Sequence, residues 1–370
     1  YAAKSGKEIA LIEKNDYLGG CIKSFKPYAD SDFFTELGAH TIYSSYATMI
    51  EALKEMNMES SILPQTKAKY LFVENSKISS IYSRLHPLDL LTHVFKASKY
   101  VKNKMTVKDY YSAIVGKKNY DDLVGPMTSA VICQTSDNVA ADLLLKKRPK
   151  DKSLPRSFSI AGGLSTYINN AVAKKNVEVR LSTTVTGITK DSDGYTVSLY
   201  KDEVLRGKQL VIATDALTAG KLLNPISQKL SELLSQLPHH PSYALGLSAE
   251  VSKIGVPPFS YMIAKNMPFR SGVSRDVVPH NKYRGVTFHL KENAGHDVAK
   301  SMLSLSGDAV EARESYILPE LRLGHHEWKA EVEKLATEIP NFHLLGNFFE
   351  GLSMEDCAIR AKEEALRATR

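Results

Sequence analysis

The first residues with a recognisable chemistry lie in the stretch IALIEKNDYLGGCIKSF, residues 9–25. Its apolar run predicts a buried strand that ends at Glu13, and the pair Gly19-Gly20 follows. A carboxylate at such a strand end accepts hydrogen bonds from ribose hydroxyls, and glycines let backbone N–H groups approach a diphosphate. The G-x-G-x-x-G turn that usually precedes this acid is not in the sequence. The stretch therefore indicates either half of a dinucleotide site or an ordinary strand with a glycine turn.

A second glycine-bearing turn lies near the C-terminus. Gly346-Asn347 follows a short apolar strand, and Gly351-Leu352-Ser353 leads directly into a terminal helix. The free N–H groups and positive dipole end of a helix suit an anionic or electron-rich ligand. A plain capped helix would show the same pattern. Between the two turns, Val185 begins a strand whose backbone could clamp an adenine ring, although that stretch is uninformative by itself.

Other side chains are candidates for chemistry, each with a structural alternative. His40 is a candidate acid or base, although a hydrogen-bonded structural histidine is the more common case. Arg275 and Arg284 are candidates for binding a substrate carboxylate, because a guanidinium pairs with it through two hydrogen bonds. Tyr243 and Tyr261 are candidates for lining the cavity, and surface positions are the alternative.

The cysteines and paired histidines predict no metal site. Cys21, Cys133 and Cys357 are too few and too scattered for a disulfide framework or a zinc site. Cys357 is expected in the first turn of the terminal helix, where a thiolate would be stabilised. A covalent link from Cys21 or Cys357 to a cofactor is therefore one alternative, and simple packing of these thiols is the more common one. The pair His325-His326 lacks a nearby acid–histidine pattern.

Composition limits the class of protein. The 370 residues are 43% hydrophobic and 24% charged, as in ordinary globular proteins. No apolar run is long enough to cross a membrane and no signal peptide is evident, so we expect a cytoplasmic protein. The formal charge of +7 favours anionic partners such as small acids, phosphates or a membrane surface. The basic run 146–152 carries no aromatic residues, which argues against nucleic acid.

One segment bears on the membrane alternative. Residues 85–104, LHPLDLLTHVFKASKYVKNK, mix apolar and basic residues at helical spacing. The pattern is typical of a helix on a membrane surface or of a cap helix that faces its own core. The second case is more common, so we expect a cap helix and keep peripheral membrane association as the alternative.

The order of the elements predicts an α/β fold. Strands alternate with helices after residue 162, whereas residues 88–145 are largely helical. This order predicts a Rossmann-like domain with an inserted α+β substrate or cap domain. A helix end at 1–7 runs directly into the first strand, so we expect the encoded protein to carry residues before Tyr1. The first domain is expected at 1–60, 160–240 and 335–370, and the cap domain at 61–159 and 241–334.

Three stretches, in this order, resemble one family. Glu13 with its glycine pair, GGLSTYINNAVAKKNVEVRLSTTVTGI (162–188) and GNFFEGLSMEDC (346–357) are similar to the FAD-dependent amine oxidase and protoporphyrinogen oxidase superfamily, whose relatives include carotenoid desaturases. The resemblance spans most of the chain. ELGAHTI (36–42), TVKDYYSAIVGKKNYDDLVGPM (106–127) and the C-terminal stretch most resemble the protoporphyrinogen oxidase branch.

The resemblance implies FAD as the cofactor and hydride transfer from a reduced substrate carbon to flavin N5. An apolar, anionic porphyrinogen is the expected substrate. An amine oxidase or a carotenoid-type desaturase is the alternative within the superfamily, and a FAD-binding scaffold without turnover is the alternative outside it. The electron acceptor stays open between oxygen and a quinone.

The resemblance also assigns cofactor contacts, whereas His40 and Arg275 are the weak catalytic candidates. Negative charge near flavin N1 and O2 would be stabilised by the helix that begins at Ser353. The implied contacts are Glu13 at the ribose; Gly19 and Gly20 at the diphosphate, with Lys23 and Ser24 close by; Gly38, Ala39, His40 and Thr41 along the isoalloxazine ring; Val185 at the adenine; Gly346 and Asn347 at the diphosphate or ribityl chain; and Leu352 and Ser353 at the pyrimidine end.

The chain departs from the family pattern at two places. The N-terminal strand with its glycine-rich turn is absent, and residues 328–341 are shorter than the corresponding loop of relatives. A protein that truly lacks the first strand should bind FAD poorly. We expect the encoded protein to contain residues at both places that this sequence omits.

Overall fold

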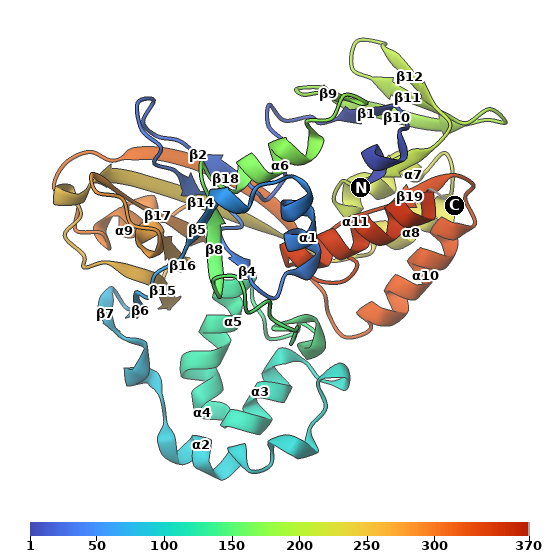
Figure 1. Ribbon diagram of the computed structural model, residues 1–370. Coiled ribbons are helices and arrows are strands. Elements are labelled where there is room, and N and C mark those ends of the chain that lie inside the picture. The colour runs from blue at the N-terminus through green and yellow to red at the C-terminus, as the bar shows by residue number, and fades with distance from the viewer. Residues whose placement is uncertain (369–370) are drawn as a thin grey trace.

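The computed structural model describes residues 1–368, and its largest element is a seven-stranded sheet (Figure 1). The strand order is β18-β14-β17-β16-β15-β6-β7, in which β15 and β6 are parallel and the other neighbours antiparallel. The strands are β6 (Lys69–Glu74), β7 (Lys77–Ser80), β14 (His239–Glu250), β15 (Phe259–Lys265), β16 (Phe269–Ser274), β17 (Tyr283–Leu290) and β18 (Val310–Pro319).

One face of this sheet packs on a core of large apolar side chains. Leu245, Phe259 and Phe288 are fully buried there, and the rings of Phe269 and Phe288 meet edge-on with centroids 5.1 Å apart. The short helix α9 (His296–Ser301) contributes to the same core. Because successive residues of a strand point to opposite faces, Tyr261 of β15 lies on the other face, where the candidate site is found.

Two parallel strand pairs and the surrounding helices form a second region. β1 (Ile9–Ile12) pairs with β9 (Val177–Arg180), and β13 (Leu210–Ile212) pairs with β19 (Phe342–Leu344). Parallel strands joined through helices confirm the Rossmann-like α/β prediction. The helices are α1 (Ala47–Glu55), α6 (Leu164–Val172), α7 (Ala216–Leu223), α8 (Gln228–Ser235), α10 (His325–Thr337) and α11 (Met354–Ala368).

The strand that ends before Glu13 is half-buried rather than buried as the sequence predicts. Within residues 1–368, β1 pairs only with β9, and Ala10 is exposed. A parallel strand becomes fully buried only when it has neighbours on both edges and helices on both faces.

Short antiparallel strands complete this part of the molecule. β10, β11 and β12 form a three-stranded sheet next to β9, β8 pairs with β4 and β5, and β2 pairs with β3 (Figure 1). The bounds are β2 (Ser24–Phe25), β3 (Thr35–Glu36), β4 (Ile42–Tyr43), β5 (Ile62–Pro64), β8 (Ser157–Ile160), β10 (Val185–Lys190), β11 (Tyr195–Leu199) and β12 (Val204–Gly207).

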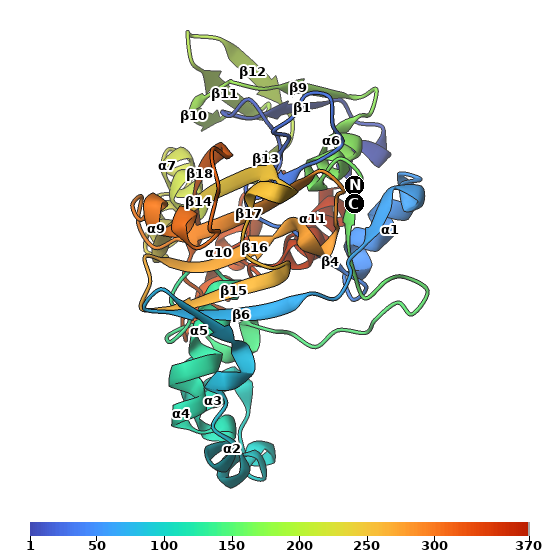
Figure 2. The same cartoon turned by 90° about the vertical axis from the view of Figure 1, so that its left-hand side faces the viewer.

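A helical block extends away from the seven-stranded sheet, with α2 at its far end (Figures 1 and 2). The Thr106 hydroxyl caps the N-terminus of the helix that follows it, because it accepts a hydrogen bond from the Asp109 N–H at 3.1 Å. The elements of the block are α2 (Pro87–Val94), α3 (Val107–Val115), α4 (Lys117–Asn119), a π-helical turn (Tyr120–Val124) and α5 (Gly125–Val131).

The expectation that residues 85–104 form a cap helix facing its own core is wrong. Every side chain of α2 is exposed or half-exposed, and Leu88 and Phe95 are exposed to 80% and 82%. The helical spacing is present, but Leu88 and Phe95 point to solvent, whereas Asp89 and the His86 carbonyl are hydrogen-bonded to the rest of the block.

Candidate functional site

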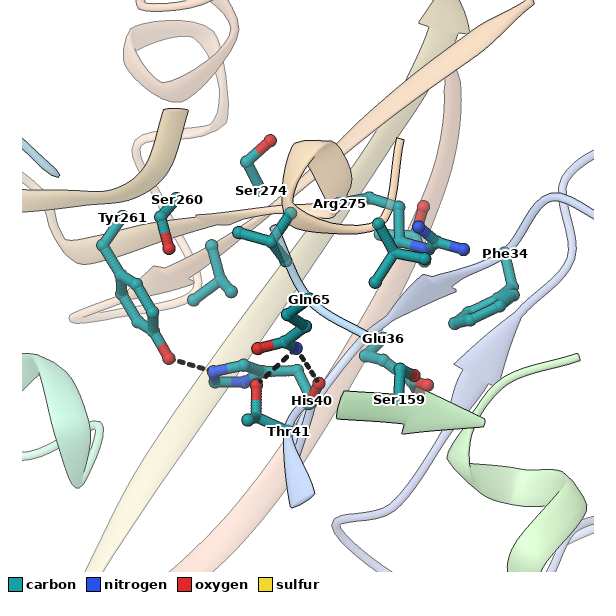
Figure 3. A pocket seen from close by; sticks show the side chains of 14 residues that line it. Phe34, Glu36, His40, Thr41, Gln65, Ser159, Ser260, Tyr261, Ser274 and Arg275 are labelled. Atoms are coloured by element: carbon teal, nitrogen blue, oxygen red, sulfur yellow. Dashed lines mark hydrogen bonds between the residues drawn. The ribbon is translucent and has the colours of Figure 1, made fainter. Parts of the chain in front are cut away.

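A small pocket opens between the segment β3–β4 and the face of the seven-stranded sheet that carries Tyr261 (Figure 3). Its free volume of about 30 Å³ has room for about two water molecules or one carboxylate group. Polar and apolar side chains from regions far apart in the chain meet there: Phe34, Thr35, Glu36, His40, Thr41, Gln65, Ser159, Ser260, Tyr261, Val273, Ser274, Arg275, Val277 and Val278.

Arg275 is the cation of this pocket. Its Nε and Nη1 are buried and have no hydrogen-bond partner within residues 1–368. Its guanidinium carbon lies 4.2 Å from the centroid of the Phe34 ring, a cation–π contact that leaves the N–H groups free. Burial lowers the pKa of Arg275 to about 10, so the group stays charged at neutral pH. A buried cation with unused donors is a site for an anionic group.

Glu36 shares the pocket but is already engaged by the fold. Its carboxylate accepts hydrogen bonds from the Leu164 N–H at 2.7 Å and from the Ser24 hydroxyl at 2.7 Å. It therefore caps the N-terminus of α6, whose cap residue Gly163 has no side chain to do so. Burial raises the pKa of Glu36 to about 7, against the opposing effects of these hydrogen bonds and of Arg275. No local pattern in the sequence indicates this role, because the partner of Glu36 lies 128 positions away.

His40 lies on the opposite wall, in a hydrogen-bonded pair with Tyr261 (Figure 3). Its Nδ1 lies 3.1 Å from the carbonyl of Gly38, an acceptor, so Nδ1 carries the proton and Nε2 accepts from the Tyr261 hydroxyl. Burial lowers the pKa of His40 and raises that of Tyr261 well above its usual value, so both stay neutral. His40 is thus held by two hydrogen bonds, as the structural alternative describes.

Thr41 lies on the same wall, and His289 is buried behind it near His40. The Gln65 amide donates to the Thr41 hydroxyl at 2.9 Å. Burial and the neighbouring His40 lower the pKa of His289 to about 3, which keeps this second histidine neutral as well. This side of the pocket therefore consists of neutral polar groups, and its charge comes from Arg275 and Glu36.

The residues at the end of β1 lie at the edge of the parallel pair. The Glu13 Oε1 accepts from the Asn15 N–H at 2.8 Å, and the Glu13 backbone bonds to Arg180 and Thr183. These bonds hold the strand end in place beside β9 and the start of the β10–β12 sheet. Val185 is the first residue of β10 and is followed by a bulge.

The glycine turn after β1 has the geometry that a diphosphate-binding turn needs. Gly19 has φ +113°, and a Cβ there would lie 2.7 Å from the Ile22 carbonyl oxygen, so a larger residue would be strained. Gly20 also has a positive φ, and open space lies where its Cβ would be. Only glycine fits at Gly19 without strain, and the space beside Gly20 is open, so the backbone of this turn is accessible to a phosphate group.

Other implied cofactor contacts are already occupied by protein groups. Lys23 pairs with Glu314 and lies 3.9 Å from the Tyr17 ring centroid. Ser24 is bonded to Glu36 and to Ser165 of α6. Gly38 and Ala39 lie against Cys21, whose carbonyl accepts the Ala39 N–H at 2.9 Å and leaves no room for a Cβ at Gly38.

The N-terminus of α11 is capped by its own residues. The Asp356 N–H donates to the Ser353 hydroxyl at 3.1 Å, and the Ser353 N–H donates to the Asp356 carboxylate at 3.2 Å. Lys146 and Arg148 also bind this carboxylate, at 3.0 and 2.6 Å. These are the contacts of a plain capped helix, and the role of Ser353, Leu352, Gly346 and Asn347 toward a cofactor stays a prediction.

Several candidates have structural roles instead. Arg284 is fully engaged, because it pairs with Asp276 at 2.6 Å and donates to the carbonyls of Ile254 and Val256. Tyr243 packs against the apolar core on the other face of the sheet. The expectation of a stabilised thiolate at Cys357 is wrong, because burial raises its pKa to about 12 and outweighs the helix end. Burial likewise raises the pKa of Cys21, to about 11.

A second, larger cavity of about 310 Å³ lies between α5 and the strands β15 and β16. Its cations are Lys265, Arg270 and Lys291, and its acids are Asp121 and Asp137. Burial lowers the pKa of Arg270 and of Lys291. This cavity is wide enough for part of a ring system, and it is lined by charges of both signs.

Neither cavity contains a metal-binding arrangement. Within residues 1–368 no group of three or more histidine, cysteine, aspartate or glutamate side chains is placed to hold a metal ion. His325 and His326 bind separately, to the Phe349 carbonyl and to the Asp142 carboxylate.

Two family models match the sequence. The model of flavin containing amine oxidoreductases matches residues 129–253, and the model of NAD(P)-binding Rossmann-like domains matches residues 1–56, which include Glu13 and the glycine pair. Each model covers less than half of the chain, and both matches indicate a likeness to the flavin-containing amine oxidoreductases. The protein is accordingly an FAD-dependent oxidoreductase, and the Gly19-Gly20 turn fits that cofactor.

Solved structures support the fold of this flavoprotein. A candidate protoporphyrinogen oxidase from Exiguobacterium sp. 255-15 matches with TM-score 0.81 and 14% identity over 100% of this chain and 95% of that one. A CLA-producing fatty acid isomerase from P. acnes matches with TM-score 0.70 and 14% identity over 98% and 99%. A redesigned putrescine oxidase matches with TM-score 0.69 and 12% identity over 100% and 94%. Because these identities are low, the flavoprotein's substrate must come from its own site.

Proposed function

We propose that the protein oxidises an apolar substrate that carries a carboxylate, with a porphyrinogen as the best representative, by hydride transfer to FAD. The observation that carries this proposal is Arg275, a half-buried cation whose Nε and Nη1 are buried and have no partner in residues 1–368. FAD, when bound, supplies the two-electron acceptor for the hydride.

The pocket residues would bind and orient the substrate. Arg275 pairs with a substrate carboxylate, and this charge-assisted contact fixes the position of the attached ring. Phe34, Val273 and Val278 line the same space and exclude water from it. A pocket of about 30 Å³ holds one acidic side group, so the apolar body of the substrate lies outside it.

The wall opposite Arg275 would do little acid–base chemistry. His40 and Tyr261 are both neutral and are committed to each other and to the Gly38 carbonyl. A hydride transfer requires orientation and exclusion of water more than a strong base. We therefore assign His40 a positioning role, with Tyr261 as the donor that fixes its ring.

Cofactor contacts at Glu13 and the Gly19-Gly20 turn belong to the same proposal. Glu13 would accept the ribose hydroxyls, and the open side of the turn would face the diphosphate. The remaining implied contacts, from Gly38 to Thr41 and from Gly346 to Ser353, follow from the same resemblance.

An amine substrate is the second candidate, because one similar structure is a putrescine oxidase. The charge of the pocket argues against it. A protonated amine would meet the Arg275 cation, and the Glu36 carboxylate is occupied by the Leu164 N–H and the Ser24 hydroxyl. The acid is therefore favoured over the amine.

The test is anaerobic reduction of the FAD-loaded protein. We expect protoporphyrinogen to bleach the flavin, its dimethyl ester to do so at least about tenfold more slowly, and putrescine to have no effect, because the ester and the amine lose the pairing with Arg275. Bleaching by putrescine, equal rates for acid and ester, or no bleaching by either porphyrinogen would contradict the proposal. Admitting air or a soluble quinone afterwards distinguishes the two proposed electron acceptors.

A further inference from the structure

An exposed apolar surface lies at the far end of the helical block. We call residues 82–104 the arm; it comprises α2 and the short turns on either side, and both views show α2 farthest from the sheets (Figures 1 and 2). The most exposed large apolar side chains of the arm are Tyr82 at 82%, Leu88 at 80%, Leu91 at 55%, Phe95 at 82% and Val101 at 64%.

The apolar side chains of α2 share one side of the helix. Leu88, Leu91 and Phe95 are spaced i, i+3 and i+7, and the backbone of Phe95 continues the helical conformation. This side faces solvent because the other side is fixed. Asp89 accepts hydrogen bonds from the backbone of residues 118 and 119, and the Asn119 amide donates to the His86 carbonyl at 3.0 Å. The exposed face is thus built into the block and is not a consequence of a loose helix.

The charge of the arm is strongly basic. Between residues 82 and 104 the bases are Arg84, Lys96, Lys99, Lys102 and Lys104, and the one acid is Asp89. Arg84 pairs with Glu74 outside the arm, and Lys102 lies against Tyr111 and the Leu144 carbonyl. Lys96, Lys99 and Lys104 are exposed, next to the apolar face.

We propose that the arm binds the surface of an anionic phospholipid membrane. Leu88, Leu91 and Phe95 would enter the boundary between headgroups and acyl chains, while Lys96 and Lys99 pair with lipid phosphates. No helix within residues 1–368 is long and apolar enough to cross a membrane, so the association would be peripheral. Charge complementarity favours this occupant over a second copy of the chain, because two copies would bring the same lysines together.

The membrane proposal is independent of the proposed substrate. Its test is flotation of the FAD-loaded protein with vesicles of phosphatidylcholine alone or mixed with phosphatidylglycerol. We expect at least about tenfold tighter binding to the mixed vesicles, weakened by salt, because each lysine near an anionic surface contributes separately. Binding that does not depend on phosphatidylglycerol or on salt would overturn the role of the lysines.

Paired variants locate the contact. The double variant Leu88→Ser/Phe95→Ser should lose at least about tenfold in vesicle affinity, because it removes the most exposed apolar side chains of α2 and of its C-cap. The control Tyr200→Ser/Val204→Ser removes exposed side chains, 69% and 51%, from the β10–β12 sheet at the opposite end of the molecule and should bind as the parent does. An unchanged flavin spectrum establishes that each variant is folded.

Two outcomes would overturn the proposal. One is equal vesicle binding by the parent and the Leu88→Ser/Phe95→Ser variant. The other is a concentration-dependent dimer in light scattering that the same variant abolishes without any vesicle binding by the parent, which would assign the face to a second copy of the chain.

Discussion

Ionisable side chains are usually exposed and large apolar ones buried, and the pocket and the arm each depart from one half of this rule. The pocket encloses the ionisable groups of Arg275 and Glu36, whereas the arm exposes the hydrocarbon of Leu88 and Phe95. Elsewhere the sheet follows the usual rule, with Leu245 and other apolar side chains inside. Departures from that rule concentrate where a protein meets something else. The two regions are therefore the places where we propose two different ligands, a substrate carboxylate and a membrane surface.

Two arginines of the protein differ in the same way, in whether their N–H groups have partners. Arg284 has a bidentate carboxylate partner and two carbonyls, whereas Arg275 has a ring beneath it and two unused nitrogens. The first stabilises the fold and the second is available to a ligand. Each prediction below tests one of these differences, from the largest expected effect to the smallest.

Arg284→Met should destabilise the protein by about 3–5 kcal/mol, because it leaves the Asp276 carboxylate buried without its partner. Urea unfolding of the two variants Arg284→Met and Arg275→Met measures the contrast. Arg275→Met should leave the unfolding free energy unchanged or higher, since it removes an unpaired charge. A large loss of stability in Arg275→Met, equal to that in Arg284→Met, would show that the pocket arginine is structural.

Glu36 should make stability depend on pH. Its pKa rises in the folded protein from 4.5 to about 7, so the fold favours the protonated form. Its contribution to stability is complete below about pH 4.5 and is lost as the pH rises through about 7, a change of about 3 kcal/mol at most. Glu36→Gln should remove this dependence between pH 4.5 and pH 7. Identical pH profiles of the melting temperature for parent and variant would refute the buried carboxyl.

Glu13→Ala should weaken FAD affinity by about 10- to 100-fold, because a charge-assisted hydrogen bond is worth about 1.5–3 kcal/mol. Fluorescence titration of the apo-protein with FAD measures this change. Glu178→Ala, at an exposed acid on the neighbouring strand β9, is the matched control and should bind FAD as the parent does. Equal affinities of the two variants would remove Glu13 from the cofactor site.

Leu88→Ser/Phe95→Ser should change the unfolding free energy in buffer by less than about 0.5 kcal/mol, because both side chains already face solvent. A loss of about 2 kcal/mol or more in urea unfolding would show that these side chains are part of a core, and the contrast with the pocket would fail.

Local features of the fold could be predicted from the sequence because their hydrogen bonds are local. The helix end at Gly6 lies within residues 1–7, where the sequence predicts it, and the Thr106 cap and the turn at Asn75-Ser76 are equally local. The α/β class followed from the alternation of elements. The strands β15, β16 and β18 were not recognised, because their burial depends on neighbours in the sheet that lie far along the chain.

The candidate site was predictable only residue by residue. His40 and Arg275 were singled out for their chemistry, but their surroundings come from distant segments: His40 meets Tyr261 across 221 positions. Glu36 could not be recognised as the cap of α6, since nothing near it in the sequence indicates its partner. In the arm, the helical period predicted from the sequence is correct, but the apolar face points to solvent and not to a core as predicted.

The central claim is that Arg275 recognises a carboxylate on the substrate that reduces the flavin. The most direct test compares the rate of anaerobic flavin reduction by protoporphyrinogen and by its dimethyl ester, in the parent and in Arg275→Met. We predict that the variant loses about 100-fold with the acid and little with the ester, so that the two substrates become equivalent. An equal loss with both substrates, or no loss with the acid, would contradict the account.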